Sequence, residues 1–134
     1  PPRLICVFCK RNMLRLAQKI AHIEHADAIV TGEIIGEQAS QTTANLRVIS
    51  SAVCDFPVLR PCAGDDKVDI ERMAMRIGTY EFASGAPQCC SLPPKYPAVN
   101  ASLRAVLEAE EEMDLSILDD EVRQARVIVL REVD

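Results

Sequence analysis

The chain has 134 residues, of which 49% are apolar and 4% aromatic, and its formal net charge is −5. This length and composition predict a single domain, residues 1–134, with a modest core. No apolar run is long enough to cross a membrane and the N-terminal residues lack the pattern of a signal peptide, so we expect a cytoplasmic protein. Nonspecific RNA binding depends on clustered Lys and Arg, and an acidic chain is therefore expected to bind RNA poorly by itself.

The first part of the chain predicts helices that alternate with strands. Residues 3–8 are expected to form a short strand or an extended lead-in. Apolar residues spaced by three and four positions then predict a helix over about residues 10–24. Residues 26–32 predict a buried strand, and a short helix is expected to follow it, capped near Ser40 or Thr42.

A second strand is predicted at "FPVLRP", residues 56–61, between two prolines. Asp65 is placed to cap the next helix, which Gly78 ends, with Ile70, Met73, Ala74 and Ile77 as its inner stripe. The rest of the chain predicts, in order, a proline-rich loop at 86–97, an acidic helix at about 102–113, a shorter helix at about 116–125 and a β-branched strand at 126–133.

Strands separated by helices predict parallel pairing and an α/β fold, in which ligands bind beyond the carboxyl ends of the strands. The polar run "VTGEIIGEQASQT", residues 30–42, lies at that edge, and so does the loop after residues 56–61. Composition leaves two interpretations of this run open: a ligand-binding loop, or an ordinary polar surface loop with Gly at its turns.

Six cysteines are many for a protein of the cytosol, where disulfides are disfavoured, so metal binding or catalysis is the better explanation. Cys6 and Cys9 have the C-x-x-C spacing that lets two thiolates share one metal ion or cluster, although a third ligand is then required. Cys54 and Cys62 have apolar or proline neighbours and are predicted to pack as small hydrophobic residues.

Two further groups of titratable residues are predicted to have structural roles. His22 and His25 stand at the end of the first predicted helix, where a cation favours the helix dipole, and we expect caps rather than metal ligands. The acidic run "EAEEEMD", residues 108–114, is predicted to be a solvated helix face.

Four stretches, in this order, carry a resemblance to a known family: "CKRNMLRLAQKIA", "VTGEIIGEQASQTTANLRVI", "PVLRPCAGDDKVDIERMAMRIGTYEFA" and "CCSLPPKYP". Over nearly its whole length the chain resembles the C-terminal part of the adenylating domain of the ThiI-type tRNA sulfurtransferases, or tRNA 4-thiouridine synthetases. These enzymes are PP-loop ATP pyrophosphatases. The resemblance implies a partial Rossmann-like sheet, of the adenine nucleotide alpha hydrolase type, that is flanked by helices and lacks the N-terminal strands.

The resemblance also implies a reaction. Enzymes of this family use ATP, with Mg²⁺, to adenylate the O4 oxygen of uridine 8 in tRNA, and sulfur then replaces the adenylate. Adenylation is needed because the O4 oxygen is a very poor leaving group. The implied partners are tRNA and a sulfur donor, and many members also supply sulfur for the thiazole of thiamine.

By motif, the resemblance assigns nucleotide contacts to Lys10, Gly32 and Gln41. A Lys meets phosphate as a point charge, a Gly allows close backbone approach, and a Gln binds an adenine or ribose edge. Each residue also has a structural explanation. Lys10 is then a solvated cation of the first turn, Gly32 a turn glycine, and Gln41 a hydrogen bonder at a helix start. Three more family matches are explained equally well by ion pairing and capping: Arg60, Asp66 and Lys67.

The sequence departs from the family by lacking the pyrophosphate-binding turn Ser-Gly-Gly-x-Asp-Ser and the RNA-binding region before it. Such turns cradle phosphate with backbone N–H groups, so we expect weak or no ATP binding by this chain alone. Two or three parallel strands leave an open edge, which a partner chain or a homodimer is expected to complete. We therefore expect this chain to be the catalytic half of a tRNA sulfurtransferase. The alternative is a non-catalytic sulfur- or metal-binding module that docks on a partner carrying the phosphate-binding half.

The resemblance assigns the catalytic thiol to Cys90, with Cys89 beside it. Members with a rhodanese extension use this thiol on a persulfide, but no extension follows "RVIVLREVD", and the chain resembles the archaeal type. In that type three cysteines hold an iron–sulfur cluster whose open iron binds hydrosulfide, which implies Cys6, Cys9 and Cys90 as ligands. A zinc site and metal-free thiols remain alternatives. We expect the two groups of thiols to converge beside the polar edge.

Overall fold

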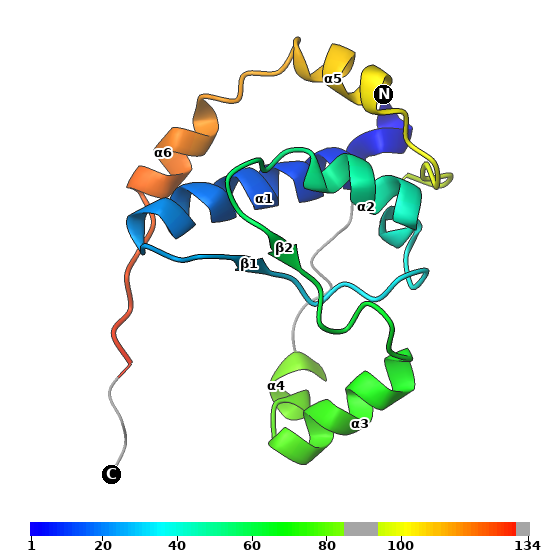
Figure 1. The fold of residues 1–134 in the computed structure, drawn as a ribbon, viewed down its shortest axis with the longest axis vertical. Helices are drawn as coiled ribbons and strands as arrows, with labels where there is room; N and C mark the ends of the chain where they lie inside the picture. The colour runs from blue at the N-terminus through cyan, green and yellow to red at the C-terminus, as the bar shows by residue number, and fades with distance from the viewer. Residues whose placement is uncertain (85–93, 131–134) are drawn as a thin grey trace.

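The computed structural model describes residues 1–84 and 94–130, and one long helix organises it (Figure 1). This helix, α1, crosses the middle of the molecule, with α2 beside it and the two strands directly below it in the view of Figure 1. The elements are η1 (Pro2–Leu4), α1 (Ile5–Ile23), β1 (Ile29–Val30), η2 (Ala39–Gln41), α2 (Thr43–Ser50), β2 (Val58–Leu59), α3 (Lys67–Ile77), α4 (Tyr80–Ser84), α5 (Leu103–Glu110) and α6 (Ile117–Arg123).

The predicted first helix is confirmed, but it begins at Ile5 rather than near Lys10. The prediction of a strand or extended lead-in at residues 3–8 is therefore wrong. Ile and Val favour strands locally, yet Leu4 and Val7 continue the buried stripe of the helix, and this burial overrides the local preference. As a result, the C-x-x-C motif lies on a helix.

The two strands pair in parallel, as predicted, with Ile29 opposite Val58 and Val30 opposite Leu59. This pairing, with helices around it, is the partial α/β arrangement that the sequence predicts. One face of the pair contributes to the core, where Ile29 is 7% exposed. On the other face Val30 and Leu59 are 65% and 51% exposed, so nothing in the described part of the chain covers it.

Asn45, a fully buried residue of α2, fastens a distant segment to the body of the molecule. Its Nδ2 donates to the backbone oxygens of Ala39 and Ala98, both at 2.7 Å, and its Oδ1 accepts from the N–H of Ala101 at 2.8 Å. Thr42 caps α2, as predicted, by accepting from the N–H of Asn45. The segment that leads to α5 is thereby held against the start of α2.

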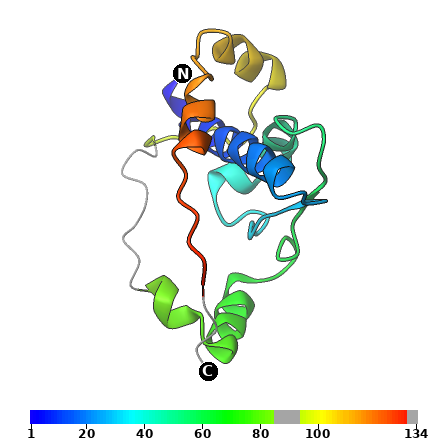
Figure 2. The same cartoon turned by 90° about the vertical axis from the view of Figure 1, so that its left-hand side faces the viewer.

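The helix that follows β2 is confirmed, with Gly78 at a φ of 79° as its left-handed stop. Its cap is Asp66 rather than the predicted Asp65. The helix α3 packs on α4, an element the sequence did not predict, and both lie far from α1 (Figures 1 and 2). The predicted inner stripe is correspondingly uncovered by the described residues, since Met73 and Ile77 are 45% and 65% exposed.

The C-terminal elements confirm two predicted helices and correct one strand. Ser102 caps α5 through the N–H of Ala105, and α6 follows within the predicted range. Residues 126–130 form no strand and their apolar side chains are exposed, because no strand edge pairs with them; residues 131–133 lie outside the described residues. None of the helices in the described ranges is long and apolar enough to cross a membrane.

Candidate functional site

A hollow of about 370 Å³ opens at the carboxyl end of β1, on the edge of the sheet where the sequence predicts a ligand site. It lies between α1 and the segment that leaves β1. Its floor is apolar, and its polar groups come from the polar run 30–42 and from Lys10. The lining residues are Lys10, Met13, Leu14, Val30, Thr31, Gly32, Glu33 and Ile49.

Glu33 joins three segments of the chain at this hollow. Its Oε1 accepts a hydrogen bond from the Nζ of Lys10 at 2.7 Å, and its Oε2 accepts from the Nε of Arg60 at 2.7 Å. The hydroxyl of Thr31 also donates to Oε2, at 3.2 Å. Lys10 is therefore a half-buried, ion-paired residue rather than a solvated cation, and Arg60 is an ion-pairing residue, as the structural explanation of that match predicts.

The charge of Glu33 is stabilised by these two cations. Burial by itself raises the pKa of the Glu33 carboxyl, but the hydrogen bonds from Lys10 and Arg60 outweigh burial and lower the pKa below its ordinary value. The group therefore stays ionised at neutral pH. Two cations share one carboxylate, so the cluster keeps one net positive charge at the edge of the hollow.

Gln41 lies in η2, beyond the residues that line the hollow. Its backbone oxygen accepts from the N–H of Gly36 at 3.0 Å, and Gly36 adopts a φ of 84° to make this turn. The side chain is buried, yet its Oε1 has no hydrogen-bond partner among the described residues. A buried acceptor without a partner is costly, but this atom is shielded from solvent, so a ligand can reach it only if the surrounding residues move.

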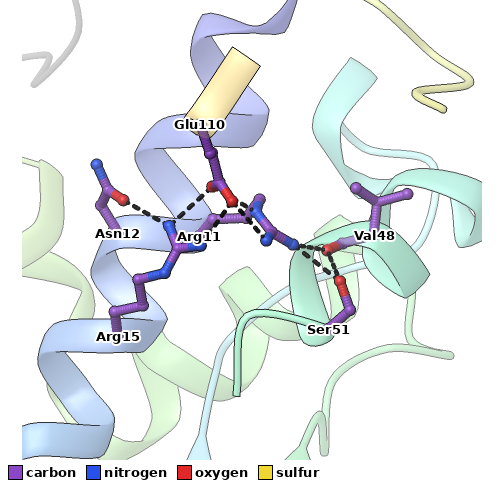
Figure 3. A network of polar contacts seen from close by, with 6 residues as sticks. All are labelled: Arg11, Asn12, Arg15, Val48, Ser51 and Glu110. Atoms are coloured by element: carbon purple, nitrogen blue, oxygen red, sulfur yellow. Dashed lines mark hydrogen bonds and ion pairs between the residues drawn. The ribbon is translucent and has the colours of Figure 1, made fainter. Parts of the chain in front are cut away.

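The opposite side of α1 carries a buried ionic network (Figure 3). Arg11, 1% exposed, donates to both carboxylate oxygens of Glu110 at 2.8 Å, and Arg15 donates to the same two oxygens at 2.8 and 2.7 Å. Arg11 also donates to the backbone oxygen of Val48 and to the Oγ of Ser51. This network ties α5 and α2 to α1. It corrects the prediction of a solvated acidic face at Glu110 alone, because Glu110 is buried while the other acidic residues of 108–114 are exposed.

The Glu110 network makes stability depend on pH. Burial alone raises the pKa of Glu110, but hydrogen bonds from Arg11 and Arg15 outweigh it and lower the pKa to about 2. Because the folded-state pKa is depressed, this stabilisation is complete above the ordinary carboxyl range and is lost as the pH falls toward 2. We expect about 3 kcal/mol of the free energy of unfolding to disappear between roughly pH 5 and pH 2.

Urea unfolding of the wild type and of Glu110→Gln across this pH range measures the contribution. The variant is expected to lack the acid-sensitive part that belongs to Glu110, whereas Glu108→Gln, at an exposed position of the same helix, should keep it. Equal pH slopes in the wild type and Glu110→Gln would show that the network contributes nothing in this range.

Cys6 and Cys9 lie one turn from the hollow on α1. Cys6 stands four residues before Lys10, and Cys9 four residues before Met13, so the helical repeat places both near the side of α1 that lines the hollow. Cys6 is half-buried and Cys9 exposed. No three His, Cys, Asp or Glu residues in the described ranges are grouped to hold a metal ion. Cys89 and Cys90 lie outside the described residues, so their convergence with Cys6 stays a prediction.

The other predicted residues have structural surroundings. Cys62 is half-buried, but Cys54 is exposed in the turn region after α2, so its prediction as a packed residue is wrong. The ring of His22 lies 3.3 Å from a carboxylate oxygen of Asp55 and packs edge-on against Phe56. The structural explanations of Asp66 and Lys67 are confirmed, because Asp66 caps α3 and Lys67 pairs with Glu37 at 2.8 Å. His25 has a positive φ, as a residue just past a helix end often does.

Sequence reasoning missed Glu33 and Glu110, each of which accepts hydrogen bonds from two cationic side chains. Glu33 follows Gly32 at the end of a predicted strand, and this position was the available signal. Glu110 stands four residues after the buried Val106, so the helical period of α5 distinguishes it from Glu108 and the other acidic neighbours.

Comparison with known proteins places the chain in a family. A family model described as thiamine biosynthesis protein (ThiI) matches residues 1–115. The chain belongs to the ThiI family. This finding confirms the family that the sequence resembles.

Curated ThiI relatives are named tRNA sulfurtransferases. A "Probable tRNA sulfurtransferase" of Methanocaldococcus jannaschii is 46% identical over 110 residues, which are 82% of this chain and 29% of that protein. A "tRNA sulfurtransferase" of Colwellia psychrerythraea is 43% identical over 127 residues, 95% of this chain and 26% of that protein. The chain thus spans between a quarter and a third of the length of these relatives.

A solved ThiI-like structure has the same fold. It is described as the crystal structure of a 4-thiouridine synthetase–RNA complex with bound ATP, and it is 39% identical with a TM-score of 0.80. The similarity covers 91% of this chain and 32% of that chain. It confirms the partial α/β, Rossmann-like class for this ThiI segment.

Proposed function

We propose that this chain is the catalytic half of an ATP-dependent tRNA sulfurtransferase. It acts in adenylating the O4 oxygen of uridine 8 in tRNA and in replacing it with sulfur, which gives 4-thiouridine. The observation that carries this proposal is that Lys10 and Gly32 line one hollow at the carboxyl edge of a parallel sheet, in a chain of the ThiI family. The description of the solved relative as an ATP and RNA complex supports the same assignment.

In this proposal the edge of the sheet binds ATP, with Mg²⁺, through three residues. Lys10 contributes a cation for a phosphate group. Gly32 lines the hollow, and a Cβ built there meets no other atom within 4 Å, so the space beside its backbone is open to a ligand. Gln41, the third residue that the family motif assigns, lies in η2 beyond the hollow, and its buried Oε1 has no partner among the described residues.

The sulfur step uses the thiols near the hollow. A sulfide attacks C4 of the adenylated uridine, the bond between C4 and O4 breaks, and AMP leaves with O4 and the electron pair. Cys6 and Cys9, three residues apart on one helix, suit two ligand positions of an iron–sulfur cluster, and Cys90 is the proposed third. When bound, such a cluster supplies an open iron site for sulfide. Cys90, with Cys89 beside it, is the proposed catalytic thiol.

The uncovered face and short edge of the sheet fit a half-domain that pairs with further strands. Val30 and Leu59 are exposed there, and a two-stranded sheet is marginal without more partners. We propose that a phosphate-binding half, from a partner chain or a homodimer, completes the sheet. The rest of the assembly supplies most of the tRNA contacts, and the sulfur mobilised here also serves thiamine thiazole synthesis.

A chimaera tests the proposed activity. This chain replaces the matching segment of the Methanocaldococcus jannaschii protein, with which it shares 46% identity over 110 residues. The chimaera, purified without air and supplied with tRNA, ATP, Mg²⁺ and sulfide, is expected to form 4-thiouridine only when ATP is present. Nucleoside analysis of the digested tRNA is the measurement.

The unmodified M. jannaschii protein is the reference in the same assay. A folded chimaera that forms no 4-thiouridine while the reference does so would contradict the enzyme and favour the non-catalytic docking module.

A further inference from the structure

Glu33 differs from the other acidic residues at the candidate site because both of its oxygens are occupied by cations from distant parts of the chain. Lys10 comes from α1 and Arg60 from the segment after β2, and each donates at 2.7 Å. Glu33 itself follows β1 and is 8% exposed. One carboxylate thus connects the helix and the β1 end that line the hollow to Arg60, which follows β2 and lies outside the lining.

We infer that Glu33 is the positioning residue of the nucleotide site: its carboxylate holds the ammonium of Lys10 and the guanidinium of Arg60 side by side, ready for a phosphate group of ATP. The inference rests on the proposed function, which puts ATP at this edge. It assigns Arg60 a part in phosphate binding and gives Glu33 a role that acts through its two partners.

The flexibility of Lys10 is the physical reason for such a device. A lysine side chain has four rotatable bonds and is strongly hydrated, so an unanchored ammonium samples many positions and loses that freedom when it meets phosphate. Glu33 restricts Lys10 before any ligand arrives, and Thr31 and Arg60 in turn fix Glu33. The Lys10 side chain then loses its conformational entropy when the chain folds rather than when ATP binds.

Arg60 is itself fixed by further contacts. Its Nη2 donates to the Oγ of Ser50 at 2.9 Å, and its Nε is the group that Glu33 holds. The guanidinium therefore connects the end of α2 to the site. Together the cluster presents two cations and one anion, and this net positive charge suits a phosphate group.

Simple charge attraction predicts the opposite effect of removing Glu33. Neutralising a carboxylate near a polyanionic ligand reduces repulsion, so Glu33→Gln should bind ATP more tightly if the ion pairs only hold the fold together. Positioning predicts weaker binding, because Lys10 and Arg60 lose the group that orders them. The sign of the change therefore distinguishes the two roles.

The test is an ATP titration of the chimaera with the M. jannaschii protein, which restores the part of the enzyme that this chain does not span, followed by amide chemical shifts so that weak binding is measurable. We expect Glu33→Gln to raise the Kd for ATP about tenfold, the scale of one lost charge-assisted hydrogen bond. Glu37→Gln is the matched control, since it removes the same charge from the same loop, where Glu37 pairs with the exposed Lys67. Its Kd should be unchanged or slightly lower.

A double-mutant cycle separates positioning from general destabilisation. If Glu33 acts through Lys10, Glu33→Gln should weaken ATP binding far less in a Lys10→Met background than in the wild type. Glu33→Asp provides a second variant in case Glu33→Gln does not fold, and its shorter side chain, which cannot reach both cations, should also weaken binding.

The outcomes distinguish this inference from the proposed function. Equal or tighter ATP binding by folded Glu33→Gln, beside a wild type that binds ATP, overturns the positioning role alone. Additive effects of Glu33→Gln and Lys10→Met overturn it as well. A chimaera that shows no ATP-dependent shifts, beside an M. jannaschii protein that does show them, overturns both the positioning role and the proposed ATP site.

Discussion

Replacing Glu110 by alanine is expected to lower the free energy of unfolding by about 3–5 kcal/mol, the cost of leaving a buried charge without its partner. Arg11 is 1% exposed and donates to both oxygens of Glu110, so its guanidinium cannot reach water when the carboxylate is removed. A loss of this size is a large fraction of the stability of a small domain. Urea unfolding at neutral pH measures it.

The control for this change lies two residues earlier on the same helix. Glu108 is 59% exposed and pairs with Arg104 at 2.7 Å, and Glu108→Ala should change the free energy of unfolding by less than about 1 kcal/mol. If Glu110→Ala costs no more than Glu108→Ala, then the network of α1, α2 and α5 does not hold the fold as we describe.

Replacing Cys9 by alanine is expected to abolish 4-thiouridine formation in the chimaera with the M. jannaschii protein. Cys9 stands one turn from the hollow and shares a helix face with Cys6, and a cluster that loses one of three thiolate ligands is not retained. The measurements are 4-thiouridine in tRNA and the iron and acid-labile sulfide of the purified protein. Both should fall together.

Cys54 is the matched control for Cys9, because it is also an exposed cysteine but lies after α2. Cys54→Ala should keep both the iron content and the activity of the chimaera. A Cys9→Ala chimaera that thiolates tRNA at the rate of the unchanged chimaera would exclude Cys9 from the sulfur step.

Local signals allowed most elements of the fold to be predicted. The spacing of apolar residues gave α1 and α3, Gly78 gave the end of α3, and Thr42 gave the cap of α2. Parallel pairing of the two strands followed from the helix between them. These features depend on neighbours within a few turns of the chain, and such neighbours are visible in the sequence.

Features that depend on distant partners could not be predicted. The start of α1 was missed because burial of Leu4 and Val7 by the rest of the fold, rather than local preference, makes residues 3–8 helical. Glu110 was assigned to solvent because its partner Arg11 lies 99 residues away. The predicted strand is absent at residues 126–130. Here the local preference of β-branched residues favours a strand, but no neighbouring strand in the described part of the chain pairs with them.

The sequence predicted the position of the candidate site in the fold, but not the ion pairs that its residues form. The sequence located the edge beyond β1 and β2, and Lys10 and Gly32 do line the hollow there. The ion pair between Lys10 and Glu33 was missed, because it joins a helix to a strand end 23 residues later. A family motif points to individual residues at such an edge, whereas the partners of those residues are visible only in the folded chain.

The most direct test of the nucleotide site is to locate ATP on the chain by its amide shifts. We predict the largest shifts at Lys10, Thr31 and Gly32, which line the hollow beside β1, and at Gln41 in η2 beyond it. Shifts confined to α3, or to the separate hollow between Arg3 and Ala105, would contradict the account, because they would put the nucleotide away from the carboxyl edge of the sheet.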